Sequence, residues 1–137
     1  RIDVVLFGEC YAGCREHVIK DSILVVEGVV GTDDVSGELR LRANTAYPLA
    51  GARRRFAREL VLQLEAADFV ADFPQVLEHL LGGGRVSDGC AVRIVYTTLA
   101  ARAELSLGSR WRVAPEDETL ARLRERFGPG RVELRYV

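Results

Sequence analysis

The segment SILVVEGVVGTDDVSGELRLRA, residues 22–43, decides how the first part of this chain folds. Its opening stretch, 22–30, is apolar on both faces, as expected of a strand in a barrel wall. The turn-forming residues of 31–37 predict a hairpin loop. Residues 38–43 alternate and predict the returning strand. The inward set is Leu39, Leu41 and Ala43, and the outward set is Glu38, Arg40 and Arg42.

Upstream of this hairpin, residues 1–7 alternate as a strand from the first position, and 9–20 carry Tyr11, Cys14 and Val18 at helical spacing. The order β-α-β-β over 1–48 describes the second half of an OB-fold, a small barrel with a helix between its third and fourth strands. Three strands cannot close that barrel. We therefore expect a piece of a larger protein, with an edge at residues 1–7 that is disordered or paired with a second copy by strand exchange.

Residues 49–137 repeat strand and helix signals and form the second predicted domain. Pro48, Gly51 and the run Arg53–Arg55 predict the connection between the domains. The pattern β-α-β-β-α-β predicts a ferredoxin-like, split βαβ arrangement, so the overall fold class is α+β. The predicted strands are 56–64, 90–97, 101–107 and 132–137, and the predicted helices run from Asp72 to a stop at Gly82–Gly84 and from Pro115 to Gly128.

Composition limits the classes of function. The chain has 137 residues, of which 48% are hydrophobic, and a net charge of −1, which argues against purely electrostatic attachment to nucleic acid. No apolar run is long enough to span a bilayer and no signal segment opens the chain, so cytoplasmic residence without a membrane partner is the expectation. The two predicted domains differ in charge: 1–48 is acidic and 49–137 is basic.

We find no catalytic set and no residues that require a cofactor. Cys10, Cys14 and His17 have a spacing compatible with a zinc site, but a structural zinc needs a fourth ligand. The same residues share one face of a short helix, where cysteine packs as an apolar residue. We favour packing, and stoichiometric zinc would support the alternative of a small metal enzyme.

Four surface features suggest binding. The run Arg53–Arg55 either contacts phosphate or is an exposed part of the linker, and we favour the linker. The outward Arg40 and Arg42 lie where single-stranded nucleic acid runs on OB barrels, although a solvated face explains them too. Trp111, the only tryptophan, either fills the core or anchors a protein interface. The apolar strand 132–137 either docks a partner by edge addition or is a plain edge of the sheet.

Two long stretches resemble the C-terminal end of the α subunit of bacterial DNA polymerase III. RIDVVLF, with DSILVVEGVVGTDDVSGELRLRA further on, resembles the closing half of its OB domain. ARAELSLGSRWRVAPEDETLARLRERFGPGRVELRYV, residues 101–137, resembles its final domain. The segment around Trp111 is the most specific part of this resemblance, which spans essentially the whole chain.

The resemblance implies a non-catalytic fragment of a DNA-directed DNA polymerase that tethers the polymerase to the τ subunit of the clamp loader. The OB domain of this family lies near the single-stranded template, and its active-site carboxylates lie upstream of this region. Ala114 departs from the residues preferred before a helix, and the terminal residues 135–137 are less acidic than this family suggests. Candidates for the τ surface or its support are Trp111, Arg112, Leu120, Leu123, Phe127, Val132, Leu134 and Tyr136. The rival hypothesis is a single-stranded DNA binding module that uses Arg40 and Arg42.

Overall fold

The computed structural model describes residues 2–82, 86 and 89–136. These divide into two compact units, Arg1–Ala52 and Arg53–Val137. Both contain strands and helices, so the chain is of mixed α and β class. The elements of the first unit are β1 (Asp3–Val5), α1 (Gly8–Cys14), β2 (Leu24–Thr32) and β3 (Leu39–Pro48), and α2 (Leu49–Phe56) spans the division. Those of the second are β4 (Ala57–Leu64), η1 (Ala66–Asp68), α3 (Phe73–Leu80), β5 (Ala91–Thr97), β6 (Arg102–Ser106), η2 (Ser109–Trp111), α4 (Asp117–Phe127), η3 (Pro129–Arg131) and β7 (Val132–Tyr136).

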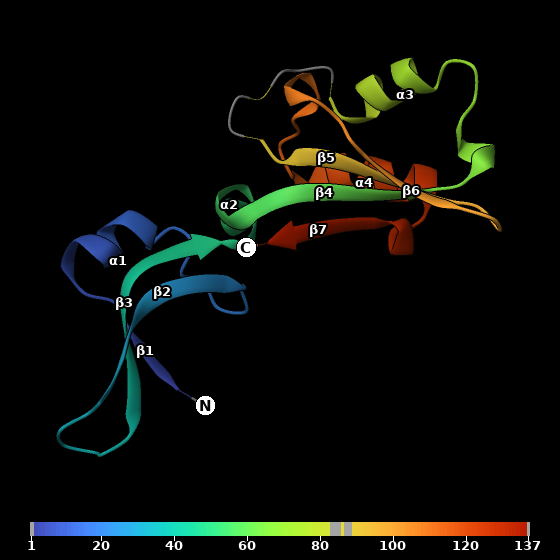
Figure 1. Cartoon of the computed structure of the whole chain (residues 1–137). Coiled ribbons are helices and arrows are strands. Elements are labelled where there is room, and N and C mark those ends of the chain that lie inside the picture. Colours follow the sequence, from blue (N-terminus) through green and yellow to red (C-terminus); the bar gives the residue numbers. More distant parts are fainter. Residues whose placement is uncertain (1, 83–85, 87–88, 137) are drawn as a thin grey trace. The chain divides into compact units, whose positions relative to one another are not determined.

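Unit 1 is a three-stranded sheet in the order β1-β3-β2, with α1 following β1 (Figure 1). β1 runs parallel to β3, and β2 pairs antiparallel with β3 through a bulge at Glu27 and Gly28. A Cβ atom on Gly28 would lie 2.2 Å from the Arg42 carbonyl oxygen, so this close approach of two backbones requires glycine. The predicted order β-α-β-β is confirmed.

The helix of unit 1 is shorter than predicted. It ends at Cys14, and the chain then turns, with Ser22 Oγ donating hydrogen bonds to the carbonyls of His17 and Ile19. Asp21 has a φ of 66°, which no helix accommodates. These local side-chain bonds compete with continuation of the helix.

Burial in unit 1 is limited to small side chains. Its buried hydrophobic residues in the described part are Cys14, Ala43, Ala46 and Ala52. Leu39, predicted to face inward, is 60% exposed, because the hairpin end of the sheet extends beyond the residues that pack against it.

Unit 2 is a four-stranded sheet in the order β6-β5-β4-β7. Its element sequence is β-α-β-β-α-β as predicted, but the ferredoxin-like topology is wrong. In a split βαβ unit another strand separates the two parallel strands, whereas here β4 pairs directly with β5 in parallel. The tight turn after β5, closed by Thr98 N–H on the Ala101 carbonyl, places β6 at the outer edge and leaves the other side of β4 to β7.

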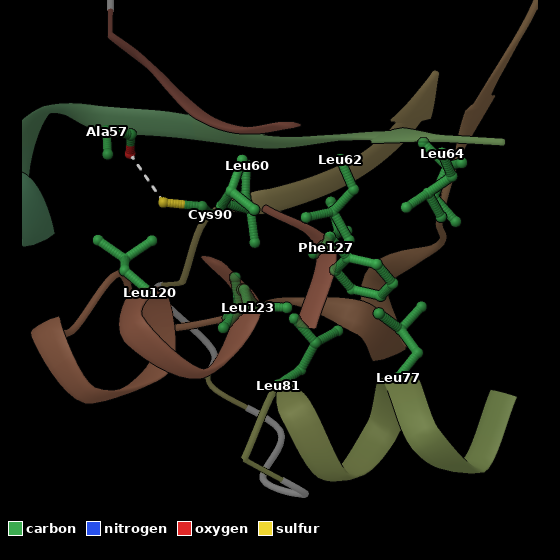
Figure 2. Packing of buried hydrophobic residues seen from close by; sticks show 14 of the residues in the cluster. Ala57, Leu60, Leu62, Leu64, Leu77, Leu81, Cys90, Leu120, Leu123 and Phe127 are labelled. Atoms are coloured by element: carbon green, nitrogen blue, oxygen red, sulfur yellow. Dashed lines mark hydrogen bonds between the residues drawn. The ribbon is translucent and has the colours of Figure 1, made fainter. Parts of the chain in front are cut away.

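One hydrophobic core holds unit 2 together. Leu60, Leu62 and Leu64 project from one face of β4 toward α4 and the C-terminal part of α3 (Figure 2). Val61 on the other face is also fully buried, as expected for β4, which is one of the two inner strands of the sheet. The partners in this cluster include Leu77, Leu81, Val92, Ile94, Leu120, Leu123 and Phe127.

A helix stands where a connection was predicted, and the start of α4 also differs from the prediction. The run Arg53–Arg55 lies in α2, which joins β3 to β4 without an intervening loop. α4 begins at Asp117 instead of Pro115, with Glu116 at the N-cap position. The helix stop after α3 falls at Gly82, where φ is 91°, while Gly83 and Gly84 lie outside the described residues. No described helix is long and apolar enough to cross a membrane.

Candidate partner-binding end of unit 2

The first residues of β4 and β5 meet the last residue of β7 at one end of the sheet. Ala57 pairs with Tyr136, and the Cys90 thiol donates a hydrogen bond to the Ala57 carbonyl oxygen at 3.5 Å (Figure 2). Cys90 also exchanges two backbone hydrogen bonds, of 2.8 and 3.1 Å, with Val113. We call this region, defined by Ala57, Cys90, Arg112 and Tyr136, the Tyr136 end.

Arg112 and Trp111 belong to this end through the segment that leads into Val113. Arg112 Nη1 donates to the Gly89 carbonyl oxygen at 2.7 Å. Trp111 is half-buried and packs against the core cluster, so one part of its ring is held while another part stays accessible. A Cβ atom on Gly89 would lie 2.6 Å from the Val113 carbonyl oxygen, so this junction requires glycine.

The first turn of α4 is tied to the arginines of α2. Arg53 forms an ion pair with Asp117, and Arg54 pairs with Glu116 at 3.0 Å. The carboxylates also lie at the helix N-terminus, where the helix dipole favours negative charge. All three arginines of the run thus make intramolecular contacts, since Arg55 lies over the ring of Phe56.

The residues that sequence analysis proposed for a partner surface separate by burial. Tyr136 is 53% exposed and Arg112 is exposed, whereas Trp111 and Leu134 are half-buried against the core. The remaining members are fully inside and can only support a surface: Leu120, Leu123, Phe127 and Val132. The resemblance to the alpha-subunit terminus supplied these candidates, and neither it nor the periodicity of α4 and β7 distinguishes core residues from contact residues.

Sequence reasoning missed a line of alternating charges across the opposite side of the same sheet. Arg93 on β5 donates hydrogen bonds from Nε to Glu59 Oε1 at 2.7 Å and from Nη1 to Glu104 Oε2 at 3.1 Å. Both carboxylates raise the pKa of Arg93, Glu59 more than Glu104. Arg135 continues the line at 3.6 Å from Glu59. The available signal was the charge at alternate positions of β6 and β7. We call this surface the charged face; it consists of Glu59, Arg93, Arg102, Glu104, Glu133 and Arg135.

The thiols do not point to catalysis. Burial raises the pKa of Cys90, so this thiol remains protonated and a poor nucleophile at neutral pH. The Cys14 thiol donates to the Cys10 carbonyl oxygen at 2.9 Å, and burial, with a contribution from Cys10, also raises its pKa. Within the described residues, no group of three or more His, Cys, Asp or Glu side chains is placed to hold a metal ion.

The two arginines predicted for nucleic acid lie on β3 in unit 1. Arg40 pairs with Asp33 at 2.5 Å, and Arg42 is exposed. Asp33 accepts hydrogen bonds from the backbone N–H and the hydroxyl of Ser36 in the hairpin loop. These hydrogen bonds, together with the positive charge of Arg40, lower the pKa of Asp33. Arg40 is therefore partly neutralised by its own loop.

The comparisons with known proteins give a consistent result. The family model described as "DNA polymerase III subunit alpha, C-terminal domain" matches residues 77–128. Over 99% of its length the chain is 38% identical to the DNA polymerase III alpha subunit of Pseudomonas aeruginosa. The chain is similar to the C-terminal region of DNA polymerase III alpha subunits. The same subunit of Vibrio cholerae is 35% identical and that of Escherichia coli K12 is 34% identical, again over 99% of the chain.

This relationship confirms the predicted resemblance and covers a small part of each relative. The chain spans 11% of the Pseudomonas aeruginosa alpha subunit and 12% of the Vibrio cholerae subunit. The match includes both units of the fold, and the family model covers the segment from α3 into the end of α4.

Proposed function

We propose that this chain is a non-catalytic C-terminal part of the DNA polymerase III alpha subunit that tethers the cytoplasmic polymerase to the τ subunit of the clamp loader. The observation that carries the proposal is the similarity to alpha subunits over 99% of the chain. In this proposal the polymerase active site lies in other parts of the subunit, and this part positions the enzyme.

The tether uses the exposed residues of the Tyr136 end. Arg112 and Tyr136 are accessible there, and Trp111, which precedes Arg112 in the chain, packs against the core. Aromatic and arginine side chains held by a rigid base are typical anchors of protein interfaces. Leu120, Leu123, Phe127 and Val132 provide that base, so little conformational entropy is lost on binding.

Unit 1 is the closing half of an OB domain in this proposal. The sheet order β1-β3-β2, with a helix after β1 and a β2–β3 hairpin, fits the second half of that barrel. The exposed apolar residues of the unit also fit a sheet that other strands cover; among them are Ile23, Val29 and Val30.

The test is a calorimetric titration of this chain with the C-terminal part of τ from the same organism. We expect 1:1 binding that weakens by about tenfold or more when Tyr136 or Arg112 is replaced by alanine. Arg124→Ala, an exposed arginine on α4, is the matched control and should leave the affinity unchanged. Absence of binding by a folded sample would reject the tether.

Single-stranded DNA binding through Arg42 is less well supported. Arg40 is paired with Asp33, and unit 1 is acidic, so little positive charge is available on β3. Fluorescence anisotropy with a labelled oligonucleotide measures this directly. Sub-micromolar, salt-sensitive binding that is lost in Arg42→Ala would place the DNA-binding function ahead of the tether.

A further inference from the structure

β6 is an edge strand whose outward backbone groups are available for pairing. β6 lies beside β5 alone in the four-stranded sheet. Leu107 N–H donates to the Val92 carbonyl, and Thr98 N–H donates to the Ala101 carbonyl, so the odd-numbered residues of this strand direct their backbone groups toward β5. The N–H and C=O groups of Arg102, Glu104 and Ser106 therefore face away from the sheet.

The side chains of β6 differ between its two faces. Arg102 and Glu104 lie on the charged face and form an ion pair, with Arg102 Nη2 3.2 Å from Glu104 Oε1. Ala103 and the 48% exposed Leu105 lie on the face that carries the core, opposite Tyr96 and Ile94 of β5. Phe69 packs edge-on against Tyr96, so an apolar strip continues from the β6 edge toward the core.

We propose that β6 pairs antiparallel with β6 of a second copy of this chain, with Ala103 opposite Ala103. In this register Arg102 of each copy lies directly opposite Glu104 of the other copy, which makes two pairs of opposite charges. The outward N–H and C=O groups of these two residues form the hydrogen bonds between the copies. A shift to the register centred on Glu104 would set two glutamates directly opposite each other, which is unfavourable. Charged residues on an edge usually block pairing, but here they select one register.

The pairing continues both faces of the sheet. A two-fold axis perpendicular to the sheet keeps the cores of both copies on one side, so the Ala103 and Leu105 strip of one copy adjoins that of the other. Leu105 lies across from Ala101 of the second copy, and its exposed surface becomes covered. The short strand makes this a concentration-dependent association instead of a permanent one.

The experiment is sedimentation equilibrium of the chain over a concentration series, with Arg102→Glu and Glu104→Arg as variants. Each variant alone sets like charges opposite each other, so we expect its dimer dissociation constant to rise about tenfold or more. An equimolar mixture of the two variants restores opposite charges at both positions, and we expect it to dimerise like the parent chain. Glu125→Arg on the exposed side of α4 is the matched control and should behave as the parent.

Circular dichroism of each variant confirms folding before sedimentation. A parent chain that stays monomeric throughout the series would overturn the proposal. A dimer that neither variant weakens would overturn it as well, because the association would then use another edge, such as β1 by strand exchange. An equimolar mixture of the two folded variants that fails to associate would also overturn the proposal. None of these outcomes depends on τ binding, which the calorimetric titration tests separately.

Discussion

Asp68 is a buried carboxylate that joins the end of β4 to the segment before β7. It accepts a hydrogen bond of 2.8 Å from the Glu65 N–H and forms an ion pair with Arg131, which also donates from Nε to the Gln63 carbonyl at 2.8 Å. Burial raises the pKa of Asp68, but the Glu65 hydrogen bond and the positive charge of Arg131 outweigh this effect and lower it overall. The ionised form thus stabilises the fold.

A lowered pKa in the folded state gives a defined pH dependence. The stabilisation by Asp68 is complete above the ordinary carboxyl pKa of the unfolded chain and is lost as the pH falls through the lower, folded pKa. We expect Asp68→Asn to reduce the free energy of unfolding at pH 7 by about 1–3 kcal/mol. The reduction should shrink toward acid pH in urea titrations. An equal reduction at pH 7 and at pH 3 would show that the charge of Asp68 does not stabilise the fold.

Gly89 permits the close contact between the start of β5 and Val113. We expect Gly89→Ala to destabilise the chain by about 1–3 kcal/mol, because the new Cβ forces the Val113 backbone away. The same change should weaken τ binding, since Arg112 is anchored on the Gly89 carbonyl. Gly130→Ala is the control: its Cβ would meet nothing within 4 Å. Equal stability of both variants by urea unfolding would contradict this account.

At the scale of elements, α4 is held in two ways, by packing in the core and by ion pairs with α2. Leu120, Leu123 and Phe127 lie on its buried face, while Glu116 and Asp117 at its start pair with α2. The helix is therefore fixed both by packing and by its N-terminal charges.

The ion pair between Arg53 and Asp117 should contribute little to the free energy of unfolding. Asp117 is 77% exposed, and pairs at the surface are worth little, so we expect a coupling of about 0.2–1 kcal/mol. A double-mutant cycle with Arg53→Ala and Asp117→Ala, read from urea unfolding with and without high salt, measures it. Coupling of the same size in high salt would indicate that it is not electrostatic.

For the whole molecule, the two units differ in how much they bury. Unit 1 buries one cysteine and small alanines, whereas unit 2 buries a continuous cluster of large side chains that includes Leu60, Leu62 and Phe127. Backbone amides exchange their hydrogens with solvent most slowly where such packing is extensive.

We expect hydrogen exchange to separate the units. Amides in β4 and β5 should be the slowest in the chain, and those in β2 should exchange substantially faster because the strand lacks a buried face. Mass spectrometry of peptic fragments reads both regions in one sample. Equal protection of β2 and β4 would mean that unit 1 has stabilising contacts beyond those of its own sheet.

Local patterns were sufficient for the kinds and order of most elements, but they did not identify α2, whose residues were predicted to be a connection. The alternation of Leu60, Leu62 and Leu64 and the helical spacing of Leu120, Leu123 and Phe127 identify a strand and a helix, because side-chain direction repeats with a period set by the backbone. The resemblance carried by the segment around Trp111 also came from the sequence alone.

The tertiary structure decided what depends on contacts between distant residues. The local pattern does not indicate that β4 pairs with β5, that Leu39 stays exposed, or that Leu123 is fully buried. The meeting of Ala57, Cys90 and Tyr136 joins three strands far apart along the chain. Periodicity reports which face of an element is apolar, whereas strand order and exposure are set by which other elements cover that face.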